Sequence, residues 1–174
     1  MDDLLTHVRA ILAGTPAHWG ALTGALATGL LTRPPAPGEW SAAQCLQHLL
    51  DAEREVFPVR VRCLLAGQDF PAFDPDAQGT VAAAGLDPRA SAREFARLRA
   101  DSLALLAGLT PADLARRARH AELGPVTLEE LLHEWAAHDL MHTVQAERAL
   151  MQPFILGSGP WRKYFADHDQ AARG

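Results

Sequence analysis

The sequence predicts an all-α fold, an antiparallel four-helix bundle with a long loop between its second and third helices. Apolar residues recur at spacings of three and four in four long segments, whereas the alternating pattern of strands is almost absent. Residues typical of helix caps precede these segments. The length of 174 residues fits one domain, and we expect residues 1–174 to form it.

The first helix is expected to begin at Leu4 and to reach about Ala27. Gly14, Thr15 and Pro16 interrupt its apolar pattern, and Pro16 can start a new helical segment. The sequence therefore leaves open whether one bent helix or two helices form here. The prolines of residues 33–40 then keep the chain extended as a linker.

The second helix has the clearest beginning. Ser41 and Gln44 form a capping box, and the apolar pattern continues to about Leu65. Pro58 lies inside this pattern and should bend or divide the helix near Phe57. Residues 67–87, rich in Gly, Pro and Asp, predict the long loop that follows.

Two further helices complete the bundle. Asp87 and Pro88 give the third helix its beginning, and its pattern continues to about residue 106. A short turn of helix is expected at Pro111, followed by an irregular stretch over residues 115–126. Thr127 and Glu130 form a second capping box for a helix over residues 128–151, which Pro153 should end. The tail is expected to dock through one turn with three aromatic residues, Trp161, Tyr164 and Phe165.

Composition excludes several classes of protein. The net charge is −5 and the basic residues are scattered, which disfavours nucleic-acid binding. No apolar run is long enough to span a bilayer, and the N-terminus lacks the pattern of an export signal. Cys45 and Cys63 have no disulfide or metal spacing and are expected to be buried free thiols. These features predict a cytoplasmic protein.

Two histidines on the last helix carry the main functional signal. His138 and His142 are four residues apart, so their side chains differ by only about 40° around the helix and share one face. Two imidazoles rarely hold a divalent ion alone, and His48 on the second helix is the candidate for the third ligand. In a bundle, side chains from neighbouring helices build such sites. The sequence thus predicts a metal site of three histidines.

Other polar residues have both a functional and a structural interpretation. Gln145 lies about 20° from His138 on the same face, and Asp139 lies about 100° away. Either side chain can orient a ligand imidazole or a bound water, and Asp139 can equally make a structural contact. His120 can line the mouth of the site or be exposed. Trp40 is expected to pack where the second helix begins.

Two segments together resemble a known family. The order "PPAPGEWSAAQCLQHLLDAE" and then "RHAELGPVTLEELLHEWAAHDLMHTVQ" is similar to the DinB-like (DNA-damage-inducible) four-helix-bundle superfamily. Its patterns W-S followed by a histidine and H-D-x-x-H-x-x-Q match Trp40, Ser41 and His48 and then His138–Gln145. The resemblance implies an up-up-down-down bundle, a metal bound by His48, His138 and His142 with open coordination positions, and a homodimer, which apolar side chains on the first helix also favour.

The family includes bacillithiol-type S-transferases and mycothiol-dependent maleylpyruvate isomerases. The resemblance therefore implies a divalent-metal-dependent transferase that activates a low-molecular-weight thiol of the bacillithiol or mycothiol type against an electrophilic substrate. The alternative is a non-catalytic stress-response or metal-binding dimeric bundle. A metal-dependent hydrolase ranks third, because no carboxylate is clearly placed as a general base. Zinc suits three imidazoles best, and nickel, manganese or iron fit the same nitrogen ligands.

Overall fold

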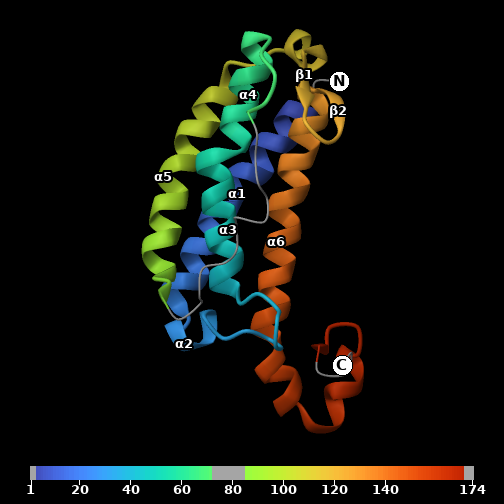
Figure 1. Ribbon diagram of the computed structural model, residues 1–174. Helices are drawn as coiled ribbons and strands as arrows, with labels where there is room; N and C mark the ends of the chain where they lie inside the picture. The colour runs from blue at the N-terminus through green and yellow to red at the C-terminus, as the bar shows by residue number, and fades with distance from the viewer. Residues whose placement is uncertain (1–2, 72–84, 171–174) are drawn as a thin grey trace.

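The computed structural model describes residues 3–71 and 85–170, and these form a bundle of long helices (Figure 1). The bundle consists of four helical segments: α1 (Asp3–Ala25), α3 (Ala42–Glu55) with its continuation α4 (Phe57–Ala66), α5 (Pro88–Ala107) and α6 (Leu128–Gly157). The predicted all-α four-helix bundle is therefore confirmed. None of the described helices is long and apolar enough to cross a membrane.

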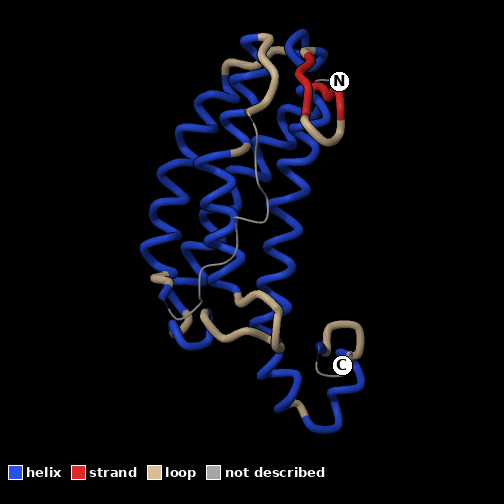
Figure 2. Tube along the Cα trace, in the orientation of Figure 1, coloured by secondary structure: helices blue, strands red, loops and turns tan. Residues whose placement is uncertain are grey.

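Short elements connect or follow these helices. Figure 2 shows that helices dominate the trace and that two strands lie together at one end of the bundle. The short elements are α2 (Thr28–Leu31), the 3-10 helices η3 (Pro111–Ala115) and η4 (Gly159–Phe165), and the strands β1 (Arg117–His120) and β2 (Gly124–Thr127).

The helix α1 is antiparallel to α5. Near the beginning of α1, the Arg9 side chain donates to the carbonyl of Leu106, close to the end of α5, at 2.5 Å. At the opposite end, the Arg89 side chain donates to the carbonyl of Thr23 at 3.0 Å. Contacts that join the start of one helix to the end of the other define an antiparallel pair.

The helices α3 and α5 run parallel. Ser91 donates to Gln47 at 3.2 Å, and Arg99 donates to Glu53 at 2.9 Å, so residue numbers rise together along the pair. The order of directions is therefore down-up-up-down rather than the expected up-up-down-down, because the first two bundle helices are antiparallel (Figure 1). The short linker returns α3 antiparallel to α1, and α5 starts beside the first half of α3. Most of the loop predicted over residues 67–87 lies outside the described residues.

The first helix is continuous, with Pro16 inside it. Proline has no N–H to donate to the carbonyl four residues earlier, which here belongs to Leu12. The Arg99 side chain donates to that carbonyl at 2.9 Å instead. Because another donor satisfies the freed carbonyl, the proline does not end the helix.

Arg99 binds groups on all the other bundle helices. Its Nε donates to Glu53 on α3 at 2.9 Å, and its Nη1 and Nη2 donate to the two oxygens of Asp139 on α6 at 2.6 and 3.1 Å. The arginine is 1 % exposed and both carboxylates are buried. Burial lowers the pKa of Arg99, but the hydrogen bonds and charges of Asp139 and Glu53 outweigh it and raise the pKa above its usual value.

The caps and the break of the second bundle helix agree with the sequence. Both predicted capping boxes form, at Ser41 with Gln44 and at Thr127 with Glu130. The second bundle helix divides at Val56, between α3 and α4, as the position of Pro58 predicts. These caps fix where α3 and α6 begin and hence which residues face the bundle interior.

The sequence predicts an irregular stretch over residues 115–126, but the structure has a β-hairpin there. The strands β1 and β2 pair in antiparallel register from Arg117 opposite Thr127 to His120 opposite Gly124. Gly124 has a φ of 78°, which suits a glycine after the tight turn. Each strand has only four residues and lacks apolar alternation, so the sequence carries little strand signal.

The last helix is longer than predicted. Pro153 lies inside α6, which continues to Gly157. Beyond it the chain folds back, because Gln152 donates to the carbonyl of His168 at 2.9 Å and accepts from the N–H of Gln170 at 3.0 Å. The predicted turn is present as η4, but its three aromatic side chains are exposed rather than docked: Trp161, Tyr164 and Phe165. Polar contacts, not these rings, hold the tail.

Replacing Arg99 tests the role of the buried ion pairs. The substitution Arg99→Met should lower the free energy of unfolding by about 3–5 kcal/mol, because it leaves Glu53 and Asp139 buried without their partner. Urea denaturation followed by circular dichroism measures this loss, with Arg97→Met at an exposed position of the same helix as the control. Neutralising both carboxylates together with Arg99→Met should restore part of the stability. Equal stability of the Arg99 and Arg97 variants would contradict this role.

Candidate metal centre

Three imidazoles converge between α3 and α6. The Nε2 atoms of His48 and His138 lie 3.0 Å apart, and one ring nitrogen from each of His48, His138 and His142 lies within 4.8 Å of the others. Within residues 3–71 and 85–170, these three histidines are the group of His, Cys, Asp or Glu side chains that lie close enough together to hold a metal ion. The structure thus brings together the three histidines that the sequence singled out.

Local structure explains this convergence. His138 and His142 lie one turn apart on α6, and His48 lies near the middle of α3. Arg99 binds Asp139, the residue after His138, and also Glu53, which follows His48 by five positions. The shared arginine therefore holds the ligand-bearing stretches of the two helices against each other.

The environment keeps the three imidazoles neutral. Burial and the neighbouring His142 lower the pKa of His48 to about 4. Burial, with the charges of His142, His48 and Arg99, lowers the pKa of His138 to about 3. Burial also lowers the pKa of His142, against the opposing effects of Gln145 and Asp139. At neutral pH each ring therefore has a free lone pair, which is the form that binds a metal.

Gln145 orients one of the three rings. The Nδ1 atom of His142 donates to the Oε1 of Gln145 at 2.9 Å. An amide oxygen can only accept, so Nδ1 carries the proton and Nε2 keeps its lone pair. Such a contact fixes both the tautomer and the orientation of a metal-binding imidazole. Gln145 thus occupies the supporting position for which its spacing made it a candidate.

Asp139 makes a structural contact and does not orient a ligand imidazole. Its carboxylate lies on the guanidinium of Arg99 rather than on an imidazole. It acts on the histidines only through its charge, which raises the pKa of His142 against burial. The ion pair with Arg99 therefore joins α6 to α5 next to His138.

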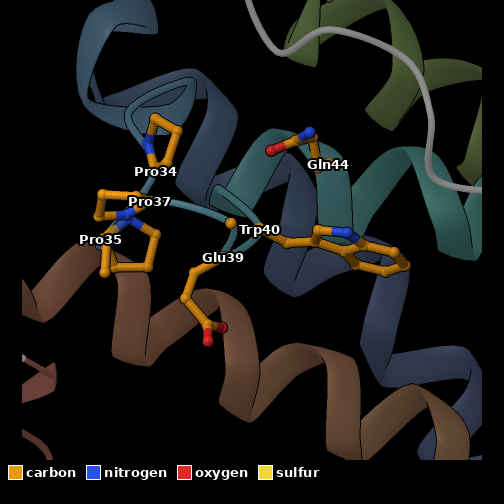
Figure 3. Close-up of a pocket in the computed structure, with 8 residues that line it drawn as sticks. Pro34, Pro35, Pro37, Glu39, Trp40 and Gln44 are labelled. Atoms are coloured by element: carbon orange, nitrogen blue, oxygen red, sulfur yellow. The ribbon is translucent and has the colours of Figure 1, made fainter. Parts of the chain in front are cut away.

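Two aromatic rings flank the imidazoles, which the sequence did not indicate. Trp40 stacks on His142, with 5.8 Å between ring centres and 20° between planes, and its ring also lies 5.1 Å from that of His48. Figure 3 shows its indole extending away from the prolines of the linker. Phe57 meets His138 edge-on at 5.1 Å. The tryptophan precedes a helix cap, and this position favoured packing at the helix entry over stacking on a substrate.

His120 lies in the hairpin rather than among the three imidazoles. Its ring contacts Arg60 on α4 and packs edge-on against Phe70. Neither cysteine belongs to the group of three histidines, and both are free thiols. Cys45 is buried, which raises its pKa to about 12, and Cys63 is half-buried rather than fully buried.

A family model of the DinB superfamily matches residues 11–146, which include all three histidines and Gln145. The match covers most of the chain, and the protein belongs to this superfamily. No protein among the curated sequences matches it.

A solved structure has the same fold. YfiT from Bacillus subtilis superposes with a TM-score of 0.74 at 21 % sequence identity, covering 83 % of this chain and 85 % of the YfiT chain. YfiT is described as a probable metal-dependent hydrolase with an unusual four-helix bundle topology. At this identity the likeness concerns the fold.

The lowered histidine pKa values predict an acid-sensitive metal-free protein. Between pH 6.5 and about 4 the unfolded chain binds protons on His48 and His138 that the folded chain does not, so stability should fall as pH falls through this range. Urea denaturation of metal-free protein at several pH values measures this dependence. The double variant His48→Gln/His138→Gln should show a smaller loss, and exposed His133→Gln an unchanged one. The same pH dependence in all three proteins would contradict the lowered pKa values.

Proposed function

We propose that this protein is a divalent-metal-dependent transferase that activates a low-molecular-weight thiol against an electrophilic substrate. The convergence of three neutral imidazoles on one point carries the proposal. Three protein ligands leave further coordination positions for a reactant, as in catalytic metal sites. The buried core already stabilises the bundle, so a metal is not required as a structural element.

The nitrogen donors suit the proposed ion. His48, His138 and His142 would hold it, with zinc as the first choice and nickel, manganese or iron compatible with the same ligands. A bound divalent ion would lower the pKa of a coordinated thiol into the physiological range and so make it a nucleophile. Gln145 keeps the lone pair of His142 available through the hydrogen bond to Nδ1.

The aromatic rings supply the surroundings that this chemistry needs. Trp40 covers one side of the imidazoles and Phe57 lies against His138. Apolar walls exclude water and strengthen the attraction between a cation and a thiolate. The chain thus supplies the ligands, their orientation and a partly dry site.

Hydrolysis is the second candidate, favoured by the description of YfiT. A hydrolase needs a general base for the attacking water. The two buried carboxylates nearest in sequence to the ligands, Glu53 and Asp139, both bind Arg99. A bound divalent ion would lower the pKa of a coordinated water as well as that of a thiol, so it is the family resemblance that favours thiol transfer over hydrolysis. A non-catalytic metal-binding or stress-response bundle is the remaining alternative.

A homodimer, expected from the family resemblance, also remains a proposal. The sequence predicted surplus apolar side chains on the first helix. Among the described residues, the large apolar side chains that are exposed on the bundle helices lie on α6 and not on α1. Leu140, Met141 and Val144 form an exposed stripe there. Their spacing of one and three residues puts them on one face, which a second copy of the chain would cover.

We also propose a cytoplasmic location, because the composition and the N-terminal residues of the sequence favour it.

An activity assay tests the proposed function. Zinc- or manganese-loaded protein is incubated with a chromogenic electrophile and bacillithiol, mycothiol or glutathione. We expect thiol-dependent turnover that falls at least about 10–100-fold in His48→Ala, because a ligand to the ion is lost. Exposed His133→Ala should retain full activity. Equal rates in wild type and His48→Ala would contradict thiol transfer at this site, whereas turnover of an ester without any thiol would favour the hydrolase.

A further inference from the structure

Trp40 contacts two of the three histidines at once. Its indole stacks on His142 of α6, with 5.8 Å between ring centres and 20° between planes. Its ring centre also lies 5.1 Å from that of His48 on α3. Both distances are within the about 6 Å over which the face of an indole attracts a cation. One ring thus packs against ligands from both helices of the candidate metal centre.

A tight turn in the linker sets the position of Trp40. The N–H of Glu39 donates to the carbonyl of Ala36 at 3.1 Å, which closes a turn of four residues. Pro37 and Gly38 are its central residues, and Gly38 has a φ of 84°. A proline followed by a glycine of positive φ is typical of a type II turn. Beyond this turn, the Trp40 indole extends away from the prolines (Figure 3).

A helix cap holds the chain on the other side of Trp40. The hydroxyl of Ser41 accepts from the N–H of Gln44 at 3.3 Å, and the N–H of Ser41 donates to the Gln44 side chain at 2.9 Å. Trp40 therefore lies between a closed turn and a closed cap, which restrict its backbone. A ring that is already held in place loses little conformational freedom when a ligand binds beside it.

We propose that Trp40 strengthens metal binding by stacking on imidazoles that carry positive charge only while the ion is bound. A divalent ion withdraws electrons from its imidazole ligands, and the electron-rich face of an indole attracts such rings more strongly than neutral ones. A contact changes an affinity only through its difference between the free and bound states. Trp40 is thus a positioning residue that acts on the ion through His48 and His142. This role rests on the metal centre of the proposed function, not on the reaction assigned to it.

Packing and stacking on the ligands have different consequences for stability. Trp40 is half-buried and also packs against buried apolar residues of the core. Packing stabilises the metal-free and the zinc-loaded protein equally. Stacking on charged ligands stabilises the zinc-loaded protein more, because the charge is present only in that state. The difference between the two states therefore isolates the contribution of the stacked ring to metal binding.

Zinc binding tests the role of Trp40. Competition with a chelator measures the affinity for zinc, and urea denaturation with and without zinc measures stability. We expect the affinity to fall about 5–30-fold in Trp40→Leu and by a smaller factor in Trp40→Phe, which keeps a weaker aromatic face. Trp40→Leu should also lose more stability with zinc than without it. Trp161→Leu, at an exposed position in η4, should bind zinc like the wild type.

A substitution in the turn tests whether the linker positions the ring. Gly38→Ala keeps the indole but disfavours the positive φ, so we expect a smaller loss of zinc affinity than in Trp40→Leu. Gly29→Ala is the matched control, because its φ is not positive and an added Cβ meets nothing within 4 Å. Equal zinc affinity of the two glycine variants would overturn the role of the turn.

The possible failures are distinguishable. Equal zinc affinity of the wild type and Trp40→Leu, or an equal loss of stability with and without zinc, would overturn the role of Trp40 and leave the three-histidine centre intact. A wild type that binds no zinc would overturn the metal centre and the role of Trp40 together. If zinc affinity depends on Trp40 but thiol transfer is absent, only the proposed reaction is wrong, since neither a thiol nor an electrophile enters this measurement.

Discussion

The buried side chain of Arg99 is the interaction on which the packing of the bundle depends. From α5 it binds a carboxylate on α3, a carboxylate on α6 and a backbone carbonyl on α1. The carbonyl is available because Pro16 cannot donate to it. A buried charge is costly unless it is fully paired, so this geometry admits few other arrangements of the four helices.

The candidate metal centre inherits its geometry from these contacts. Asp139 and Glu53 are drawn to one arginine, and this places His138 and His142 opposite His48. The same buried network therefore aligns the helices and brings the three histidines together.

The sequence predicted the features that depend on local spacing. The capping boxes, the break near Pro58 and the shared face of the histidines follow from residues a few positions apart. The Arg99 network joins residues that are forty or more positions apart, and no local pattern marks it. The sequence did not predict the hairpin, because its strands are short. It placed the end of the last helix too early, because the hydrogen bond lost at Pro153 does not end α6, which later contacts anchor. Helix directions likewise depend on the path of the connections, which spacing does not reveal.

Metal content is the most direct test of the central claim that three imidazoles from two helices form a metal centre. Elemental analysis of protein purified under metal-replete conditions should find one divalent ion per chain in the wild type. His138→Ala should lose that ion while keeping its helical circular dichroism, because the histidine is a ligand and Arg99 still joins the helices. The absence of stoichiometric metal in the wild type, or equal metal content in His138→Ala, would contradict the account.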